Sequence, residues 1–146
     1  MSKTLKDIAE TMRDIDFCML TTVAENGAIA ARPMSNNREV EYDGDSWFYS
    51  TDDSHMAKDI AANPNVGLSY QGDAGLLGVI GKPGAFVHVE GRASLIRDKA
   101  VFAEHWQNSL DRWYPQGIDT PGMVMIKVHA GRIHYWDGED EGEVSV

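Results

Sequence analysis

The chain has 146 residues, the size of one ordinary domain, and its 13 Lys and Arg against 23 Asp and Glu give a formal net charge of -10. Hydrophobic residues make up 42% and charged residues 25%, a composition typical of a globular protein, not of a disordered or fibrous one. Because the sequence offers no basic stripe for a phosphate backbone, nucleic acid and anionic membranes are poor candidates as main partners.

The first third of the chain predicts a helix followed by a hairpin. Apolar residues between positions 4 and 15 follow a helical spacing, and Thr4 with Asp7 resembles a capping box. Residues 17–23 predict a strand, and Asn26-Gly27 predicts a tight turn in which both central residues have positive φ. Pro33 interrupts the partner strand, residues 28–36, and therefore predicts a sheet edge or a bulge.

The middle of the chain alternates strands with one helix. Two strands flank residues 43–45, and the second runs over residues 46–51. Several N-cap residues precede a helix that Pro64 ends, and further strands are expected at 66–71 and 86–96. Between these two strands a glycine stands at every third position, which we interpret as a flexible loop: Gly72, Gly75, Gly78, Gly81 and Gly84.

The last third predicts a helix over residues 98–110, an irregular segment, and a final hairpin over 123–136 that turns at Ala130-Gly131. Five acids and no base stand in residues 137–146, so we expect residues 138–146 to form an acidic, mobile tail behind a single domain of residues 1–137. Six or seven short strands with two or three helices predict a mainly β fold, a small β-barrel with flanking helices.

Residues around the central helix are candidates for a phosphate site. Ser50 and Thr51 end a strand, Ser54 stands at the start of the helix, and Arg32 lies on an earlier strand. Free amides at a helix start, hydroxyls and a guanidinium together suit a phosphate. The alternative is that Asp53 or Ser54 only caps the helix and Arg32 is a surface charge, which the local pattern alone favours.

Several short motifs occur in a fixed order along almost the whole chain. They are Leu20-Thr21-Thr22-Val23, Asn26-Gly27, Arg32-Pro33-Met34, Trp47-Phe48-Tyr49-Ser50-Thr51, Asp53-Ser54, Ile60, Asn63-Pro64, Gly91-Arg92-Ala93, Trp113-Tyr114-Pro115-Gln116-Gly117 and Tyr135-Trp136-Asp137. This ordered set resembles the general stress protein branch of the pyridoxamine 5'-phosphate oxidase-like, FMN-binding split-barrel family.

The resemblance implies a six-stranded Greek-key split barrel and a homodimer that holds FMN, with FAD as the alternative, at the subunit interface. Arg32, Pro33 and Met34 would lie along the flavin, and Ser54 would bind its phosphate. The residues that the resemblance assigns to the cofactor are Arg32, Pro33, Met34, Ser50, Thr51, Ser54, Trp113 and Tyr114, and Lys58 is added to these candidates as the nearest lysine. Ser50 and Thr51 would touch the ring or ribityl chain, and residues 113–117 would approach from the partner subunit.

The sequence departs from the family near the expected phosphate. Relatives usually carry a basic residue two positions after the helix-start serine, whereas Met56 stands there in this chain. His55 or Lys58 would have to compensate, although either could equally be solvated. The glycine-rich loop is also longer than in relatives, and no role follows from that length.

The resemblance implies an FMN-binding oxidoreductase of unknown substrate. The alternatives are a flavin-sequestering stress module without turnover and a haem-binding relative on the same barrel. We expect no metal site, since His88, His129 and His134 lack the spacing of a ligand set, and Cys18 is interpreted as an inert core residue. With no export signal and a single cysteine, the chain is expected to be cytoplasmic.

Overall fold

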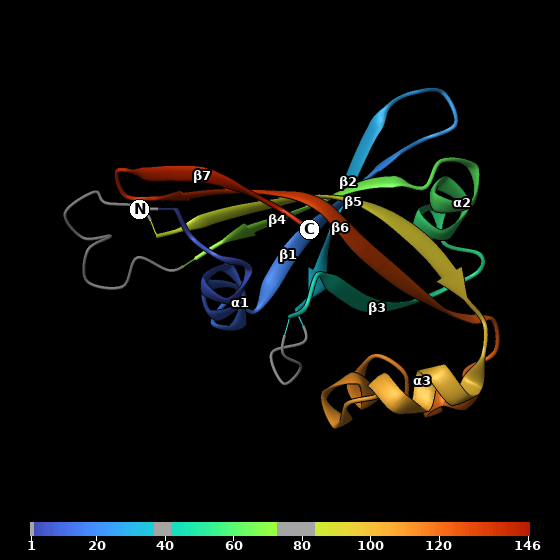
Figure 1. The fold of residues 1–146 in the computed structure, drawn as a ribbon. Coiled ribbons are helices and arrows are strands. Elements are labelled where there is room, and N and C mark those ends of the chain that lie inside the picture. Colours follow the sequence, from blue (N-terminus) through green and yellow to red (C-terminus); the bar gives the residue numbers. More distant parts are fainter. Residues whose placement is uncertain (1, 37–41, 73–83) are drawn as a thin grey trace.

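The computed structural model describes residues 2–36, 42–72 and 84–146, which fold into one antiparallel sheet with helices packed against it (Figure 1). The helices are α1 (Leu5–Arg13), α2 (His55–Ala62) and α3 (Lys99–His105), followed by the 3-10 turns η2 (Asn108–Arg112) and η3 (Gly117–Asp119). The strands are β1 (Phe17–Val23), β2 (Ile29–Ser35), β3 (Asp45–Thr51), β4 (Asn65–Gln71), β5 (Phe86–Ile96), β6 (Met123–Asp137) and β7 (Asp140–Ser145). The mainly β fold predicted from the sequence is confirmed.

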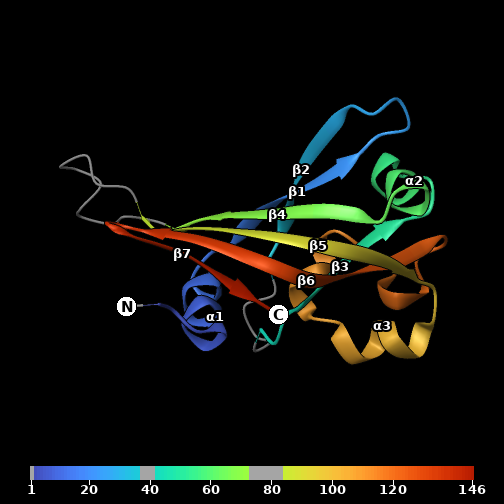
Figure 2. The ribbon, with the colours of Figure 1, turned by 45° about the horizontal axis from the view of Figure 1, so that its top comes forward.

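The strands follow the order β2-β1-β4-β5-β6-β3, and β7 pairs with β6 outside this path. All pairs are antiparallel. Strand β2 lies at one edge, as Pro33 predicted, because an edge strand tolerates a residue without an amide hydrogen. Helix α2 lies near the end of the sheet opposite α1 (Figures 1 and 2), and none of the described helices is long and apolar enough to cross a membrane.

Two apolar cores hold these elements together. The larger one lies where α1 and α2 pack on the sheet, with Ile8, Leu20, Leu68 and Ile133 fully buried in it. The smaller one joins β3 and β6 to α3 and η2 through residues such as Phe102. The smaller core fixes the α3–η2 segment beside β3, which positions one wall of the site described below.

The hairpin between β1 and β2 forms where the sequence predicted it, but its turn is longer. The N–H of Gly27 donates to the carbonyl of Ala24 at 2.9 Å, and the N–H of Ala24 donates to the carbonyl of Ala28 at 2.8 Å. Gly27 has φ +82°, whereas no described residue other than glycine has a positive φ. The turn therefore needs one left-handed residue, not two, as in three-residue hairpin loops. The capping box of Thr4 and Asp7 is confirmed.

Two predictions for the end of the chain are wrong. Residues 123–136 form no hairpin, because β6 runs straight through Ala130 and Gly131 and absorbs the glycine as a bulge opposite β5. The chain instead turns at Gly138, with φ +63°, and the acidic segment pairs with β6 as β7. This segment is an ordered strand, not a mobile tail, since Val144 packs against the larger core while the acids point outward.

The predicted helix over 98–110 is shorter than expected. Helix α3 ends at His105 because Trp106 adopts an extended backbone, and the helix is followed by η2. Trp106 uses this position to pack edge-on against Tyr49, with ring centroids 5.1 Å apart. The predicted strand before residue 43 and the glycine-rich loop fall largely outside the described residues.

The close contacts of Gly91 at the bulge between β5 and β6 lead to a prediction about stability. A Cβ on Gly91 would lie 2.8 Å from Cγ1 of Val128 and 2.9 Å from the carbonyl oxygen of His129, and the backbone has little room to move. We expect Gly91→Ala to lower the free energy of unfolding by about 1–3 kcal/mol in a urea titration. Gly131→Ala is the matched control, because its nearest new contact is 3.6 Å, and it should cost less than about 0.5 kcal/mol. Equal losses in the two variants would contradict this account of the bulge.

Candidate functional site

A pocket of about 360 Å³ opens between β2, β3 and the α3–η2 segment. Most of its lining is aromatic or apolar: Phe17, Pro33, Met34, Trp47, Phe48, Tyr49, Met56, His105, Leu110, Trp113 and Tyr114. Small polar side chains complete it: Ser35, Asn36, Ser50, Gln107 and Ser109. Among the described residues, no Lys, Arg, Asp or Glu lines the pocket, so its chemistry suits a flat ring without a formal charge.

Hydrogen bonds between the pocket walls fix their separation. The hydroxyl of Tyr49 donates to the buried carbonyl of Phe102 at 2.7 Å, and the hydroxyl of Tyr114 donates to the carbonyl of Tyr49 at 3.1 Å. His105 stacks on Trp47 with ring centroids 3.9 Å apart. Burial raises the pKa of both tyrosines, so their phenols stay protonated and keep donating these bonds near neutral pH.

The structure brings together several of the residues that the sequence assigned to a site. Pro33 and Met34 come from β2, Ser50 from β3, and Trp113 and Tyr114 from the residues that follow η2. All five line the same pocket within one chain, whereas the sequence-based expectation took Trp113 and Tyr114 from a partner subunit. Trp113 is 60% exposed although it lines the pocket, and the guanidinium carbon of Arg112 lies 5.1 Å from the centroid of its ring.

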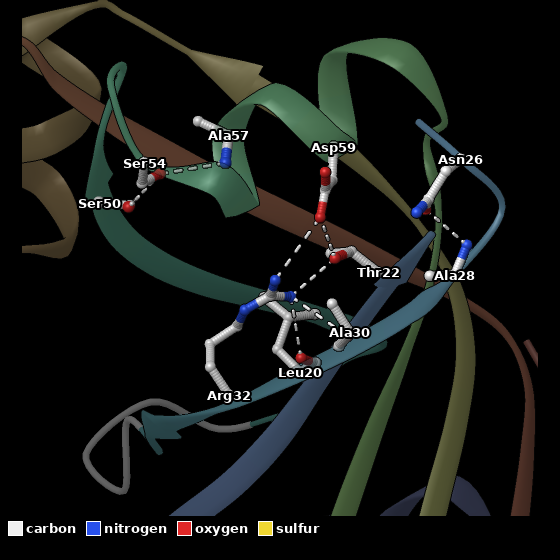
Figure 3. A network of polar contacts seen from close by, with 10 residues as sticks. All are labelled: Leu20, Thr22, Asn26, Ala28, Ala30, Arg32, Ser50, Ser54, Ala57 and Asp59. Carbon is white, nitrogen blue, oxygen red and sulfur yellow. Dashed lines mark hydrogen bonds and ion pairs between the residues drawn. The ribbon is translucent and has the colours of Figure 1, made fainter. Parts of the chain in front are cut away.

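The start of α2 lies beside the pocket and is capped from within the chain. The N–H of Ala57 donates to Oγ of Ser54 at 3.1 Å, and the hydroxyl of Ser50 donates to the same oxygen at 3.0 Å (Figure 3). The hydroxyl of Thr51 donates to Asp53 at 2.6 Å. Ser54 is thus the N-cap, as the simpler interpretation held, and neither Ser54, Thr51 nor the exposed Lys58 lines the pocket.

Arg32 lies outside the pocket lining and belongs to an internal polar network. Its Nη1 donates to Oγ1 of Thr22 at 2.8 Å and to the carbonyl of Leu20 at 3.2 Å (Figure 3). Its Nη2 lies 3.6 Å from Oδ2 of Asp59, and the hydroxyl of Thr22 donates to that same oxygen at 2.8 Å. The side chains of Arg32 and Asp59 are only 23% and 12% exposed, so Arg32 is not a surface charge.

Sequence reasoning missed Asp59, although a signal was present. Asp59 precedes the buried Ile60 and stands three residues after the buried Met56, so helical spacing puts it on the inner side of α2. An acid at such a position needs a partner. Thr22, fully buried on β1, and Arg32 supply it.

Comparison of the sequence with models of protein families identifies the family of this chain. A model of proteins described as "pyridoxamine 5'-phosphate oxidase like" matches residues 3–146. The chain belongs to this family. A comparison with curated protein sequences found no match.

Solved structures of the same fold agree with this family. A Clostridium acetobutylicum protein related to general stress protein 26 is 19% identical, with 94% of this chain and 90% of that chain covered and a TM-score of 0.76. General stress protein 26 of Bacillus anthracis is 24% identical over 95% of both chains, with a TM-score of 0.73. A haem-binding protein of Mycobacterium smegmatis is 13% identical over 99% of this chain and 60% of its own, with a TM-score of 0.72. The open sheet described here is therefore a split barrel of this family, as the sequence predicted.

Met56 stands at the position where the resemblance noted from the sequence led us to expect a basic residue. Its side chain is only 7% exposed, lines the pocket and packs in the larger core. Met56 therefore contributes apolar contact where a cation was expected.

The remaining candidates have structural roles. His129 pairs with Asp45 at 2.7 Å, and His134 lies 3.4 Å from Glu143. Over residues 2–36, 42–72 and 84–146, no three His, Cys, Asp or Glu side chains are placed to hold a metal ion. Burial raises the pKa of the Cys18 thiol to about 11, so it stays protonated and unreactive in the core.

Proposed function

We propose that this protein binds a flavin, FMN with FAD as the alternative, in the pocket between β2, β3 and η2, and acts as an oxidoreductase of the general stress protein type. The observation that carries the proposal is the meeting of Pro33, Met34, Ser50, Trp113 and Tyr114 in one uncharged, aromatic-lined pocket. Its volume of about 360 Å³ lies within the usual range of small-molecule sites. The lining fits the flat isoalloxazine ring, which needs aromatic contact and a few polar groups at its edge.

The chain's own residues would bind and orient the ring. A bound flavin carries the redox chemistry, while the protein supplies position and electrostatics. Trp113 and Tyr114 offer aromatic surface on one wall, Pro33 and Met34 close the other, and Ser50 offers a hydroxyl. Since the described lining contains no carboxylate or ammonium, proton transfer by an acidic residue or a lysine is not part of this proposal.

The proposal includes a homodimer with the flavin near the subunit interface. Phe17 and Met19 on β1 are 54% and 41% exposed, and Ile29 on β2 is 70% exposed. The pairing of Phe17 with Ser35 and of Met19 with Pro33 puts these side chains on one face of the hairpin. Phe17 and Pro33 also line the pocket, so a partner covering this apolar face would also cover the pocket mouth.

Thermal unfolding with added ligand tests the proposal. FMN at about 100 times its dissociation constant should stabilise the fold by ~2.7 kcal/mol, a rise of about 5–10 °C in Tm for a domain of this size. Adenosine monophosphate is the matched control, because it carries a phosphate but no flavin ring, and it should leave Tm unchanged. An unchanged Tm at millimolar FMN would exclude the proposed cofactor.

Optical spectra separate the proposal from its alternatives. A protein purified with flavin should be yellow and absorb near about 450 nm, whereas a Soret band would favour haem, the ligand named for the Mycobacterium smegmatis structure. Bleaching of the bound flavin by NADH or NADPH would distinguish an oxidoreductase from a module that only sequesters flavin. An oxidoreductase should show this bleaching under anaerobic conditions, and a sequestering module should not.

A further inference from the structure

We propose that Asp59 withholds Arg32 from the ligand's phosphate, so that this pocket selects the flavin ring and distinguishes little between FMN and riboflavin. The proposal rests on the function proposed above and adds which part of the ligand is recognised. The lining offers aromatic and apolar contact to a flavin ring. No Lys or Arg among the described residues lines the pocket, so the lining offers no such cation to a phosphate.

The two terminal nitrogens of the Arg32 guanidinium contact groups of the chain itself. Nη1 donates hydrogen bonds to the hydroxyl of Thr22 and the carbonyl of Leu20, and Nη2 forms an ion pair with the carboxylate of Asp59 (Figure 3). Thr22 holds Asp59 in this position with a hydrogen bond of 2.8 Å. A phosphate that approached Arg32 would meet a carboxylate already paired with it, and like charges at such distances repel. Asp59 therefore takes the place that an anionic ligand group would need.

Near the start of α2, the described lining of the pocket offers no Lys or Arg in place of Arg32. Met56 is buried and neutral, and the exposed Lys58 does not line the pocket. The hydroxyl of Ser54, which accepts from Ala57 and Ser50, has a single uncharged hydrogen to donate. Asp53 adds a further negative charge next to the N-cap, where it accepts from Thr51. A dianionic phosphate here would rely on the Ser54 hydroxyl, helix amides and water, against the negative background of the whole chain.

Because Arg32 is not expected to contact the phosphate, the pocket should prefer the phosphorylated flavin only weakly. One charge-assisted hydrogen bond commonly raises affinity about ten- to a hundredfold. Without it, we expect the dissociation constants of FMN and riboflavin to lie within about threefold of each other in the unaltered protein. Quenching of flavin fluorescence during titration with the full chain measures both constants.

Asp59→Asn tests the role of the carboxylate. Asparagine keeps the size of the side chain and an oxygen for the hydroxyl of Thr22, but removes the charge that holds Arg32. We expect FMN to bind about tenfold more tightly and riboflavin to bind unchanged. Glu10→Gln removes the same charge from the exposed side of α1 and should change neither constant. In an Arg32→Ala background, Asp59→Asn should no longer favour FMN.

The outcomes separate this inference from the function on which it rests. FMN binding more than about thirtyfold more tightly than riboflavin in the unaltered protein would overturn the inference, and this comparison needs no variant. An Asp59→Asn protein that gains affinity equally for both flavins, or for neither, would also overturn it. If the unaltered protein binds neither flavin, the proposed function fails as a whole.

Discussion

Replacing Arg32 by alanine is expected to lower the free energy of unfolding by about 3 kcal/mol. The substitution removes the partner of Asp59, whose side chain is 12% exposed, and leaves the fully buried Thr22 with one contact fewer. Breaking a buried ion pair from one side typically costs about 3–5 kcal/mol, and the 23% exposure of Arg32 puts this case at the lower end. Urea unfolding followed by far-UV circular dichroism measures the loss.

Arg97→Ala provides the matched control for this prediction. Arg97 also pairs with an aspartate, Asp52, at 2.7 Å, but both side chains are about half exposed. Such surface pairs contribute about 0–1 kcal/mol, so this variant should be nearly as stable as the unaltered protein. If Arg32→Ala costs no more than Arg97→Ala, the network around Asp59 does not stabilise the fold.

The same Arg32→Ala variant separates two roles for the arginine. Because Arg32 does not line the pocket, we expect its dissociation constant for FMN to stay within about threefold of the unaltered value. A direct phosphate contact predicts a loss of about ten- to a hundredfold instead. Titration under conditions in which the variant remains folded distinguishes the two results.

Trp113→Ala is expected to weaken flavin binding by about thirtyfold without destabilising the fold. The indole lines the pocket yet is 60% exposed, so its apolar surface is available to a ring and contributes little to the core. Removing it takes away aromatic contact and apolar burial, each of which supports ring binding. FMN and riboflavin should lose affinity equally, since both carry the same ring.

Trp136→Ala is the control for Trp113→Ala. Trp136 is also partly exposed, at 39%, but it lies at the end of β6 and does not line the pocket. We expect its flavin affinity to equal that of the unaltered protein. Equal losses in the two tryptophan variants would mean that the ring binds elsewhere or that both act through the fold.

The order and kind of the elements could largely be predicted from the sequence, because local signals and packing agree. The capping box at Thr4, the N-cap at Ser54 and the edge strand marked by Pro33 are examples. The error at Ala130 and Gly131 arose because a glycine inside a strand can mark either a turn or a bulge, and only pairing with β5 decides between them. The formation of β7 likewise depends on the packing of Val144 and the pairing with β6. The number of acidic residues in this segment gives no sign of either.

The candidate site was predictable in part. Pro33, Met34, Ser50, Trp113 and Tyr114 were singled out from the sequence, and the fold brings them to one pocket. The partner of Arg32 could not be predicted in the same way, since Asp59 lies 27 positions further along the chain and only the packing of α2 against β1 brings the two together.

A crystal structure of the protein with bound flavin tests the central claim most directly. We predict that the isoalloxazine ring lies in the pocket, between Pro33 and Met34 on one wall and Trp113 and Tyr114 on the other, while Arg32 remains paired with Asp59. A ring bound outside these walls, or none bound at saturating flavin, would contradict the account.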